Sequence, residues 1–318
     1  MMKVLMLVGA IIPLIGCSQS VRLMVVAFDE EGNPVTNASV RIQTLRKRFF
    51  GAGQNPGDFR WISAQSDTNG VTAVELDMVT CDLSYWLTAA GYYASPCHDV
   101  HYRIQSQNLF SLTLEEHQKE EQVVLRKIKN PIPMFGYGSP TWLGVKLPVH
   151  GEYGYDMKAG DFVTPYGKGK VSDFYIRKNY DEKTRDGRSA LFFKGRGNGA
   201  YKIKAFTDSE FRSCYAADTN AVFETEFRHE YLKSETGSYC REVCDVKEDE
   251  CLVLRTRCQY DEQGRLVSCN YSKIYGKIEI RSYLQFRAYA FNPTPNDPNL
   301  EFDVKQNLLQ KDTSPYFP

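Results

Sequence analysis

The residue of this chain with the clearest chemistry is Cys17, because its thiol follows a short segment typical of secretory signals. Lys3 gives the segment a positive start, and an apolar run extends from Val4 to Ile15. The run is about a dozen residues long, whereas a membrane-spanning helix needs roughly 20. Pro13 lies inside it, where proline disrupts a helix. The sequence therefore predicts a cleaved signal peptide over residues 1–16, with Cys17 first after the cut.

The run Leu14-Ile15-Gly16-Cys17 resembles the lipobox of bacterial lipoproteins. The resemblance implies that the Cys17 thiol receives a diacylglyceryl group and that the new N-terminus receives an acyl chain such as palmitate. Residues 17–20 would then form a lipidated N-terminus, and two or more acyl chains anchor a protein stably. Ser18, rather than an aspartate, follows the cysteine, which implies the outer membrane. The predicted location is thus the cell envelope, with an ordinary unlipidated signal as the alternative.

The remaining eight cysteines are expected to form disulfide bonds, because exported proteins meet an oxidising environment. Cys81 and Cys97 lie in the first half and are predicted to pair. In the second half, a turn-forming segment separates Cys258 from Cys269, so a bridge across a hairpin is possible if the strand register allows it. The spacings lack the close cysteine pairs of structural zinc sites, so no metal and no cofactor is expected. The second half holds six cysteines: Cys214, Cys240, Cys244, Cys251, Cys258 and Cys269.

Other residues that could do chemistry do not form a catalytic pattern. His98 and His101 are three residues apart, which places them on opposite faces of a strand. No nucleophile motif is present, and acidic pairs such as Asp181-Glu182 lie in charged loops. We therefore expect no catalytic residues.

A binding surface is expected near Trp61. The glycine- and arginine-rich segment from Arg46 to Arg60 is predicted to be a long loop, and loops on a rigid scaffold commonly carry binding residues. Phe59, Arg60 and Trp61 are the candidates, with Trp61 able to stack on a sugar. Packing in a sheet core is the alternative role for an aromatic residue here.

The elements that would position these residues are short strands. Val40, Ile42 and Thr44 alternate with polar neighbours, as in a half-buried strand. Asn69-Gly70 indicates a hairpin turn between two such segments. About seven strand-like runs over residues 21–128 predict a β-sandwich.

The pattern Asp29-x-x-Gly32-x-Pro34-Val35-x-x-Ala38-x-Val40 is followed by Asp67-x-x-Gly70 and Ala90-Gly91-Tyr92-Tyr93. These motifs resemble carboxypeptidase-regulatory-like and bacterial Ig-like modules, and the resemblance implies a transthyretin-like sandwich. It covers roughly a third of the chain and supplies no catalytic residues.

The predicted fold class is all-β, with the Ig- or transthyretin-like sandwich followed by a β-rich, disulfide-containing domain. Prolines predict a linker over residues 129–142, and β-prone runs predict the second domain over 143–291, which resembles no family we recognise. Residues 292–318 are proline-rich and predict an extended surface tail.

Charge gives the last constraint on function. Lysine plus arginine equals aspartate plus glutamate at 39 each, so no net field favours nucleic acid. We therefore expect an outer-membrane-anchored lipoprotein that is not an enzyme and has a binding or scaffolding role. Its partners would be the membrane, through the lipid, and an envelope glycan or protein. The alternatives are a glycan-acting hydrolase with its site in the second domain, and a subunit of an envelope assembly.

Overall fold

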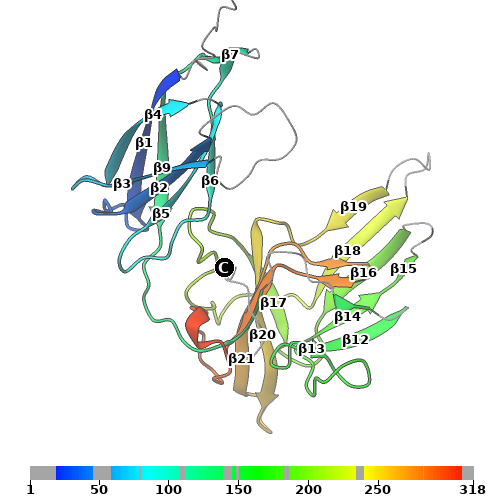
Figure 1. The fold of residues 1–318 in the computed structure, drawn as a ribbon. Coiled ribbons are helices and arrows are strands. Elements are labelled where there is room, and N and C mark those ends of the chain that lie inside the picture. The colour runs from blue at the N-terminus through cyan, green and yellow to red at the C-terminus, as the bar shows by residue number, and fades with distance from the viewer. Residues whose placement is uncertain are drawn as a thin grey trace, which may run out of the picture. The chain divides into compact units, whose positions relative to one another are not determined.

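The computed structural model shows a chain built from β-strands (Figure 1). Its described residues contain one short 3₁₀ turn, Val304–Gln306, and no α-helix, so the all-β prediction is confirmed. No helix in this part of the chain is long and apolar enough to cross a membrane. The predicted signal and Cys17 lie outside the described residues, which are 19–45, 59–78, 80–107, 112–138, 145–147, 150–181, 183, 186–233, 240–281 and 283–309.

The chain divides into two compact units, residues 1–127 and 128–318. The first is a sandwich of two main sheets, and side chains from both, such as Leu23 and Ile42, share one core. One sheet has the order β4 (Val71–Met78), β1 (Gln19–Asp29), β9 (Gln118–Leu125). The other has the order β3 (Phe59–Gln65), β2 (Ser39–Leu45), β5 (Asp82–Thr88), β6 (His98–His101). A small pair, β7 (Ile104–Gln107) and β8 (Leu112–Leu114), completes the unit.

The sequence predicted a hairpin at Asn69-Gly70, but the turn joins β3 to β4, which belong to different sheets, so the hairpin prediction is wrong. The turn itself still requires glycine at Gly70. Its φ is +76°, a conformation that other residues rarely adopt. A Cβ at this position would also lie 2.4 Å from the carbonyl oxygen of Ala27. The turn joins β3 to β4 and so connects the two sheets of the sandwich.

The described residues of the second unit form two larger sheets and one small one. The first has the order β10 (Phe135–Gly138), β24 (Ala288–Phe291), β21 (Leu266–Tyr275), β20 (Glu250–Tyr260), β17 (Gly199–Lys204). The second has the order β13 (Asp161–Phe162), β12 (Gly151–Asp156), β14 (Phe174–Lys178), β16 (Asp186–Phe192), β18 (Glu226–Lys233), β19 (Cys240–Cys244), with β15 (Tyr180–Asp181) beside β16. The small sheet has the order β11 (Val145–Lys146), β23 (Tyr283–Gln285), β22 (Glu279–Ile280).

The core of this unit is aromatic. Tyr155 stacks on Phe174 with ring centroids 5.1 Å apart, and Tyr289 meets Tyr155 edge-on at 6.2 Å. Both sheets contribute to this cluster, since Tyr289 belongs to β24 and Tyr155 to β12. Stacked and edge-on aromatic pairs add to the burial of apolar surface.

Two segments pack more closely than the sequence predicted. In the predicted linker, Met134 is fully buried and residues Phe135–Gly138 form β10. In the predicted extended tail, Leu300 is fully buried, and the Glu301 carboxylate accepts hydrogen bonds from the Lys129 and Asn130 backbone N–H groups. Proline content indicated irregular backbone in both segments but not their burial.

The predicted Cys81–Cys97 disulfide is wrong. Asp82 pairs with His101 and Tyr85 pairs with His98, so the two cysteines lie at opposite ends of the β5–β6 ladder. At about 3.4 Å per residue, this separation is roughly 15 Å, far beyond the span of a disulfide.

Cys258 and Cys269 lie together across the β20–β21 hairpin. Thr256 pairs with Asn270 and Gln259 with Ser268, so Cys258 lies in a bulge opposite Cys269. Both are thiols in the structure. Burial raises the pKa of Cys258 to about 11, and contact with Cys269 adds to this effect.

We predict that Cys258 and Cys269 form a disulfide when the protein is exported to an oxidising compartment. Closing so short a loop stabilises the fold by roughly 2–3 kcal/mol. Peptide mapping without reduction should recover a Cys258–Cys269 linked peptide and no Cys81–Cys97 peptide. Recovery of Cys258 and Cys269 as alkylated thiols from oxidised protein would contradict the prediction.

Candidate functional site

The outer face of the β3-β2-β5-β6 sheet carries exposed aromatic, basic and polar side chains. In β2, Val40 and Ile42 point into the core, so Arg41 and Gln43 point to solvent. In β5, the same alternation buries Leu83, Tyr85 and Leu87 and directs Ser84 and Trp86 outward. One face of this sheet therefore belongs to the core, and the other carries the more exposed side chains of the described residues.

The strand register places two tryptophans side by side on this outer face. Gln43 pairs with Trp61 and Arg41 pairs with Trp86. The two indole rings have centroids 5.6 Å apart and are tilted by 35°. The Arg41 guanidinium lies 4.2 Å from the centroid of the Trp61 ring, which is a cation–π contact.

We call Arg41, Gln43, Trp61, Ser63 and Trp86 the tryptophan face. Trp61 is 45% exposed, so part of its indole ring is open to solvent. Because its strand and its contact with Arg41 fix its position, the face is formed before any ligand arrives. A preformed aromatic surface loses little conformational entropy on binding.

The structure corrects the predicted placement of the candidate binding residues. Phe59, Arg60 and Trp61 were expected in a loop, but they begin strand β3. Arg60 pairs with the inward-facing Thr44, so it lies on the face opposite to Trp61. The loop residues 46–58 lie outside the described part of the chain. A binding role for the three residues stays a prediction.

A polar row continues the outer face along β5 and β6. The Ser84 hydroxyl donates to the Asp99 carboxylate at 2.6 Å, and His101 Nδ1 lies 2.7 Å from Asp82 Oδ1. His98, in contrast, stacks on the buried Tyr85 ring with centroids 5.0 Å apart. The two histidines thus lie on opposite faces, as their spacing predicted.

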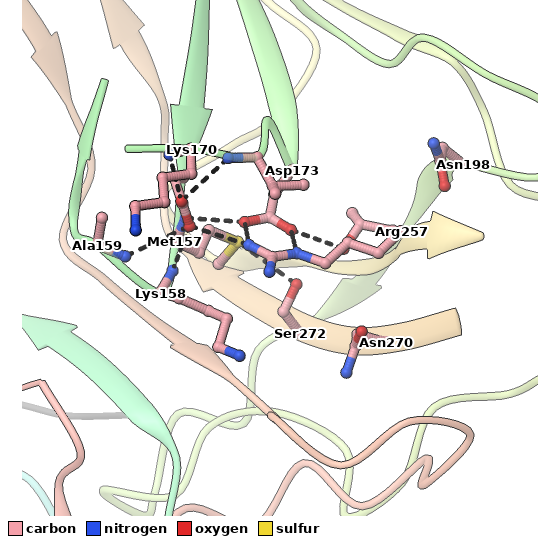
Figure 2. A network of polar contacts seen from close by, with 12 residues as sticks. Met157, Lys158, Ala159, Lys170, Asp173, Asn198, Arg257, Asn270 and Ser272 are labelled. Carbon is pink, nitrogen blue, oxygen red and sulfur yellow. Dashed lines mark hydrogen bonds and ion pairs between the residues drawn. The ribbon is translucent and has the colours of Figure 1, made fainter. Parts of the chain in front are cut away.

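The second unit contains a buried ion network that the sequence did not indicate (Figure 2). Arg257 Nε and Nη2 bind both oxygens of Asp173 at 2.7 and 2.8 Å, and Nη2 also reaches Asp156 Oδ1 at 2.9 Å. The Asp173 side chain is completely buried. The bidentate geometry joins β20 to the sheet that holds β12 and β14.

Backbone groups complete the network. Asp156 accepts from Lys158, Ala159, Lys170 and Val171, while the Met157 N–H donates to Asp173. Burial alone would raise the pKa of Asp156, but these donors outweigh it and hold the pKa below its ordinary value. Every carboxylate oxygen in the network has a donor. This arrangement indicates a structural role, because all four carboxylate oxygens are already engaged by groups of the protein.

Burial raises the pKa of Asp173 above its ordinary value, although the neighbouring Arg257 guanidinium acts in the opposite direction. Arg257 itself has a φ of +56°, which is strained for a residue other than glycine. It occupies the bulge between Thr256 and Gln259. The ion pairs hold the backbone there, so the charge network and the local strain depend on one another.

A second cluster combines histidine, cysteine and glutamate without making a catalytic site. His229 and Cys244 are paired across β18 and β19. His229 Nδ1 accepts from the Ile280 N–H at 3.0 Å, so Nε2 carries the proton and donates to Glu242 at 2.8 Å. Burial lowers the pKa of His229 and raises that of Cys244. Both imidazole nitrogens are engaged, so His229 cannot deprotonate the thiol.

Glu242 is the centre of that cluster. Burial works to raise its pKa, but the donors Lys277, Tyr231 and His229 outweigh burial and lower it to about 2. Lys277 Nζ lies 2.7 Å from the carboxylate. A carboxylate held ionised by three donors is a poor general acid.

Comparisons with known proteins identify no family for this chain. No family model and no curated protein matches the chain. Solved structures with weak likeness include the full-length major pilin SpaD of Corynebacterium diphtheriae, with TM-score 0.28, 8% identity, and coverage of 78% of this chain and 91% of that one. The major pilin subunit BcpA of Bacillus cereus gives TM-score 0.25, 9% identity, and coverage of 89% and 95%.

A 3-chlorocatechol 1,2-dioxygenase from Rhodococcus opacus 1CP gives TM-score 0.27 and 10% identity over 36% of this chain. The chain spans 62% of the length of that enzyme. TM-scores this low support no conclusion about the function of this chain. The function of this chain has to be inferred from its own residues.

We predict that Arg257→Met lowers the free energy of unfolding by about 3–5 kcal/mol, because it leaves two buried carboxylates without their cation. Methionine retains most of the side-chain volume without the charge, and the positive φ at this position is unchanged. Denaturant unfolding of the variant and the parent measures the difference.

Arg265→Met is the matched control. Arg265 pairs with Asp261 at 2.7 Å, but its side chain is 76% exposed, so we expect a cost of at most about 1 kcal/mol. Equal stability of the two variants would show that the Arg257 network is not structural.

Proposed function

We propose that this chain is a non-catalytic, lipid-anchored envelope protein that binds carbohydrate on the tryptophan face. The observation that carries the proposal is the pair of indole rings, 5.6 Å apart, on the solvent side of a sheet whose other side is core. Ordinary surface residues on such a face are polar, so two neighbouring tryptophans require a reason.

The chemistry of the face fits a sugar. Indole rings offer flat apolar surfaces on which the C–H groups of a pyranose can stack. Arg41, Gln43 and Ser63 supply donors and acceptors for hydroxyl groups at the edge of the rings. A small set of polar groups around an apolar surface is typical of small-molecule and sugar recognition.

The acidic and imidazole groups of the second unit support the non-catalytic part of the proposal. A glycosidase needs two carboxylates with access to substrate. Asp156 and Asp173 are buried and held by Arg257, and Glu242 is held by cationic and hydroxyl donors. The alternative of a glycan-acting hydrolase therefore finds no support in these three carboxylates.

The anchor rests on the sequence alone. Cys17 ends the lipobox-like run, and β1 begins at Gln19. With so few residues between them, the lipid would hold the first unit close to the membrane surface. The outer-membrane location and the carboxypeptidase-regulatory-like relationship are proposals of the same kind.

Trp61→Ala and Trp86→Ala should each weaken binding of a glycan identified by array screening by about tenfold, which corresponds to about 1.4 kcal/mol. Trp61→Phe should reduce the affinity for the glycan by a smaller factor, because the smaller phenyl ring keeps part of the stacking surface. Isothermal titration of the purified protein with the identified glycan measures these changes.

Tyr283→Ala serves as a control, because Tyr283 is an exposed aromatic residue of the second unit. The Tyr283→Ala substitution should leave the affinity for the glycan unchanged. Glycan binding that survives loss of both tryptophans would refute the proposed site, and a screen in which no glycan binds would refute the proposed ligand class. Measured turnover of a glycan would refute the non-catalytic assignment.

Cys17→Ser should release the protein from the membrane fraction, because serine cannot accept the thioether-linked lipid. Fractionation of cells followed by immunoblotting measures retention. Cys97→Ser, which alters a cysteine outside the lipobox, should not change it. If the Cys17→Ser protein stays in the membrane, lipid anchoring at this residue is excluded.

A further inference from the structure

Three side chains of different chemistry meet at one end of the β5–β6 ladder. They are Cys81, Asp82 and His101, and one ligand atom from each lies within 4.8 Å of the other two. Asp82 Oδ1 lies 2.7 Å from His101 Nδ1, and Cys81 Sγ lies 3.4 Å from Asp82 Oδ2. A thiol, a carboxylate and an imidazole therefore converge on one point.

The backbone holds this cluster in place. Asp82 and His101 are directly paired residues of neighbouring antiparallel strands. The Tyr102 N–H donates to the Cys81 carbonyl at 2.8 Å, so hydrogen bonding between the chains continues past the pair. Tyr102 is itself fully buried. Ligands on paired strands keep their separation, which loop residues do not.

Asp82 and His101 face solvent, whereas Cys81 is partly buried against the sandwich core. Asp82 is 70% exposed and His101 is 63% exposed. An ion could reach them without any movement of the sandwich core. A solvent-facing position also leaves room for a further ligand, such as water.

We propose that Cys81, Asp82 and His101 bind a Zn²⁺ ion. Cysteine sulfur, histidine nitrogen and aspartate oxygen are the three protein donors that Zn²⁺ uses, at about 2.0–2.3 Å. In a tetrahedral site such bonds place the ligand atoms about 3.3–3.8 Å apart. The observed spacing needs only side-chain rotation to reach this geometry. The thiolate and imidazole together select zinc over Mg²⁺ and Ca²⁺, which prefer oxygen ligands.

Binding would move protons in a defined way. The thiol of Cys81 loses its proton to solvent as the sulfur–zinc bond forms. His101 binds through Nδ1, so its remaining proton resides on Nε2. Three protein ligands leave the fourth position open to water or to a ligand oxygen.

The next residues along the same strands provide a contrast. Cys97 Sγ lies 3.8 Å from Asp99 Oδ1, and Asp99 also accepts from Ser84. No imidazole completes this second group among the described residues. Cys97 and Asp99 therefore supply matched controls on the same hairpin.

The test is metal titration of the purified protein with Zn²⁺ and Co²⁺, in the presence of a phosphine reductant that keeps thiols reduced. We expect uptake of one equivalent of Zn²⁺, measured by competition with a chromophoric chelator. Co²⁺ should give the near-ultraviolet thiolate-to-cobalt band and the visible bands of a tetrahedral site. Cys81→Ser should abolish the thiolate band, and His101→Ala should weaken affinity by more than tenfold.

Cys97→Ser and Asp99→Asn should bind both metals as the parent does. Circular dichroism of each variant checks that the sandwich is folded. The proposal fails if the folded parent takes up no stoichiometric metal, or if Cys81→Ser retains the thiolate–cobalt band. It also fails if Cys97→Ser removes that band. Because the readout is metal uptake, its outcome is separate from that of glycan binding.

Discussion

The antiparallel register of β3, β2, β5 and β6 is the constraint on which the proposed functions of the first unit depend. One face of this sheet is buried against the β4-β1-β9 sheet, so a shift of one residue would exchange core and surface along a whole strand. The observed register pairs Arg41 with Trp86 and Asp82 with His101. The same alternation that buries Ile42 and Tyr85 therefore forms the tryptophan face and places Asp82 and His101 of the proposed zinc site on the outer surface.

The second unit depends on a different interaction. Arg257 holds Asp156 and Asp173 from a strained bulge, and it joins the two larger sheets of that unit at a buried position. Removing a buried cation leaves the buried carboxylates without a compensating charge. The resulting loss of folding stability is larger than the net stabilisation that the intact ion pair provides. The second unit thus uses this buried set of charges for folding, while the first presents its proposed functional groups on the surface.

Period-2 alternation allowed the sequence to predict an all-β chain and the inward direction of Val40 and Ile42. The spacing of His98 and His101 likewise placed them on opposite faces. Alternation acts within one strand, however, and partners such as Trp61 and Trp86 depend on register between strands. The proximity of Cys81, Asp82 and His101 was not predicted for that reason, since His101 is distant from Cys81 in sequence. The same limit produced the incorrect Cys81–Cys97 pairing and concealed the Asp173–Arg257 contact.

The central claim is that a sugar binds on the tryptophan face, and the indole N–H resonances of the protein test it most directly. The chain has three tryptophans, so an ¹⁵N–¹H spectrum of indole-labelled protein shows each one separately. Titration with the identified glycan should shift the Trp61 and Trp86 signals together, with one saturation curve that matches the calorimetric affinity. Saturable glycan binding with both of these signals unmoved would contradict the account.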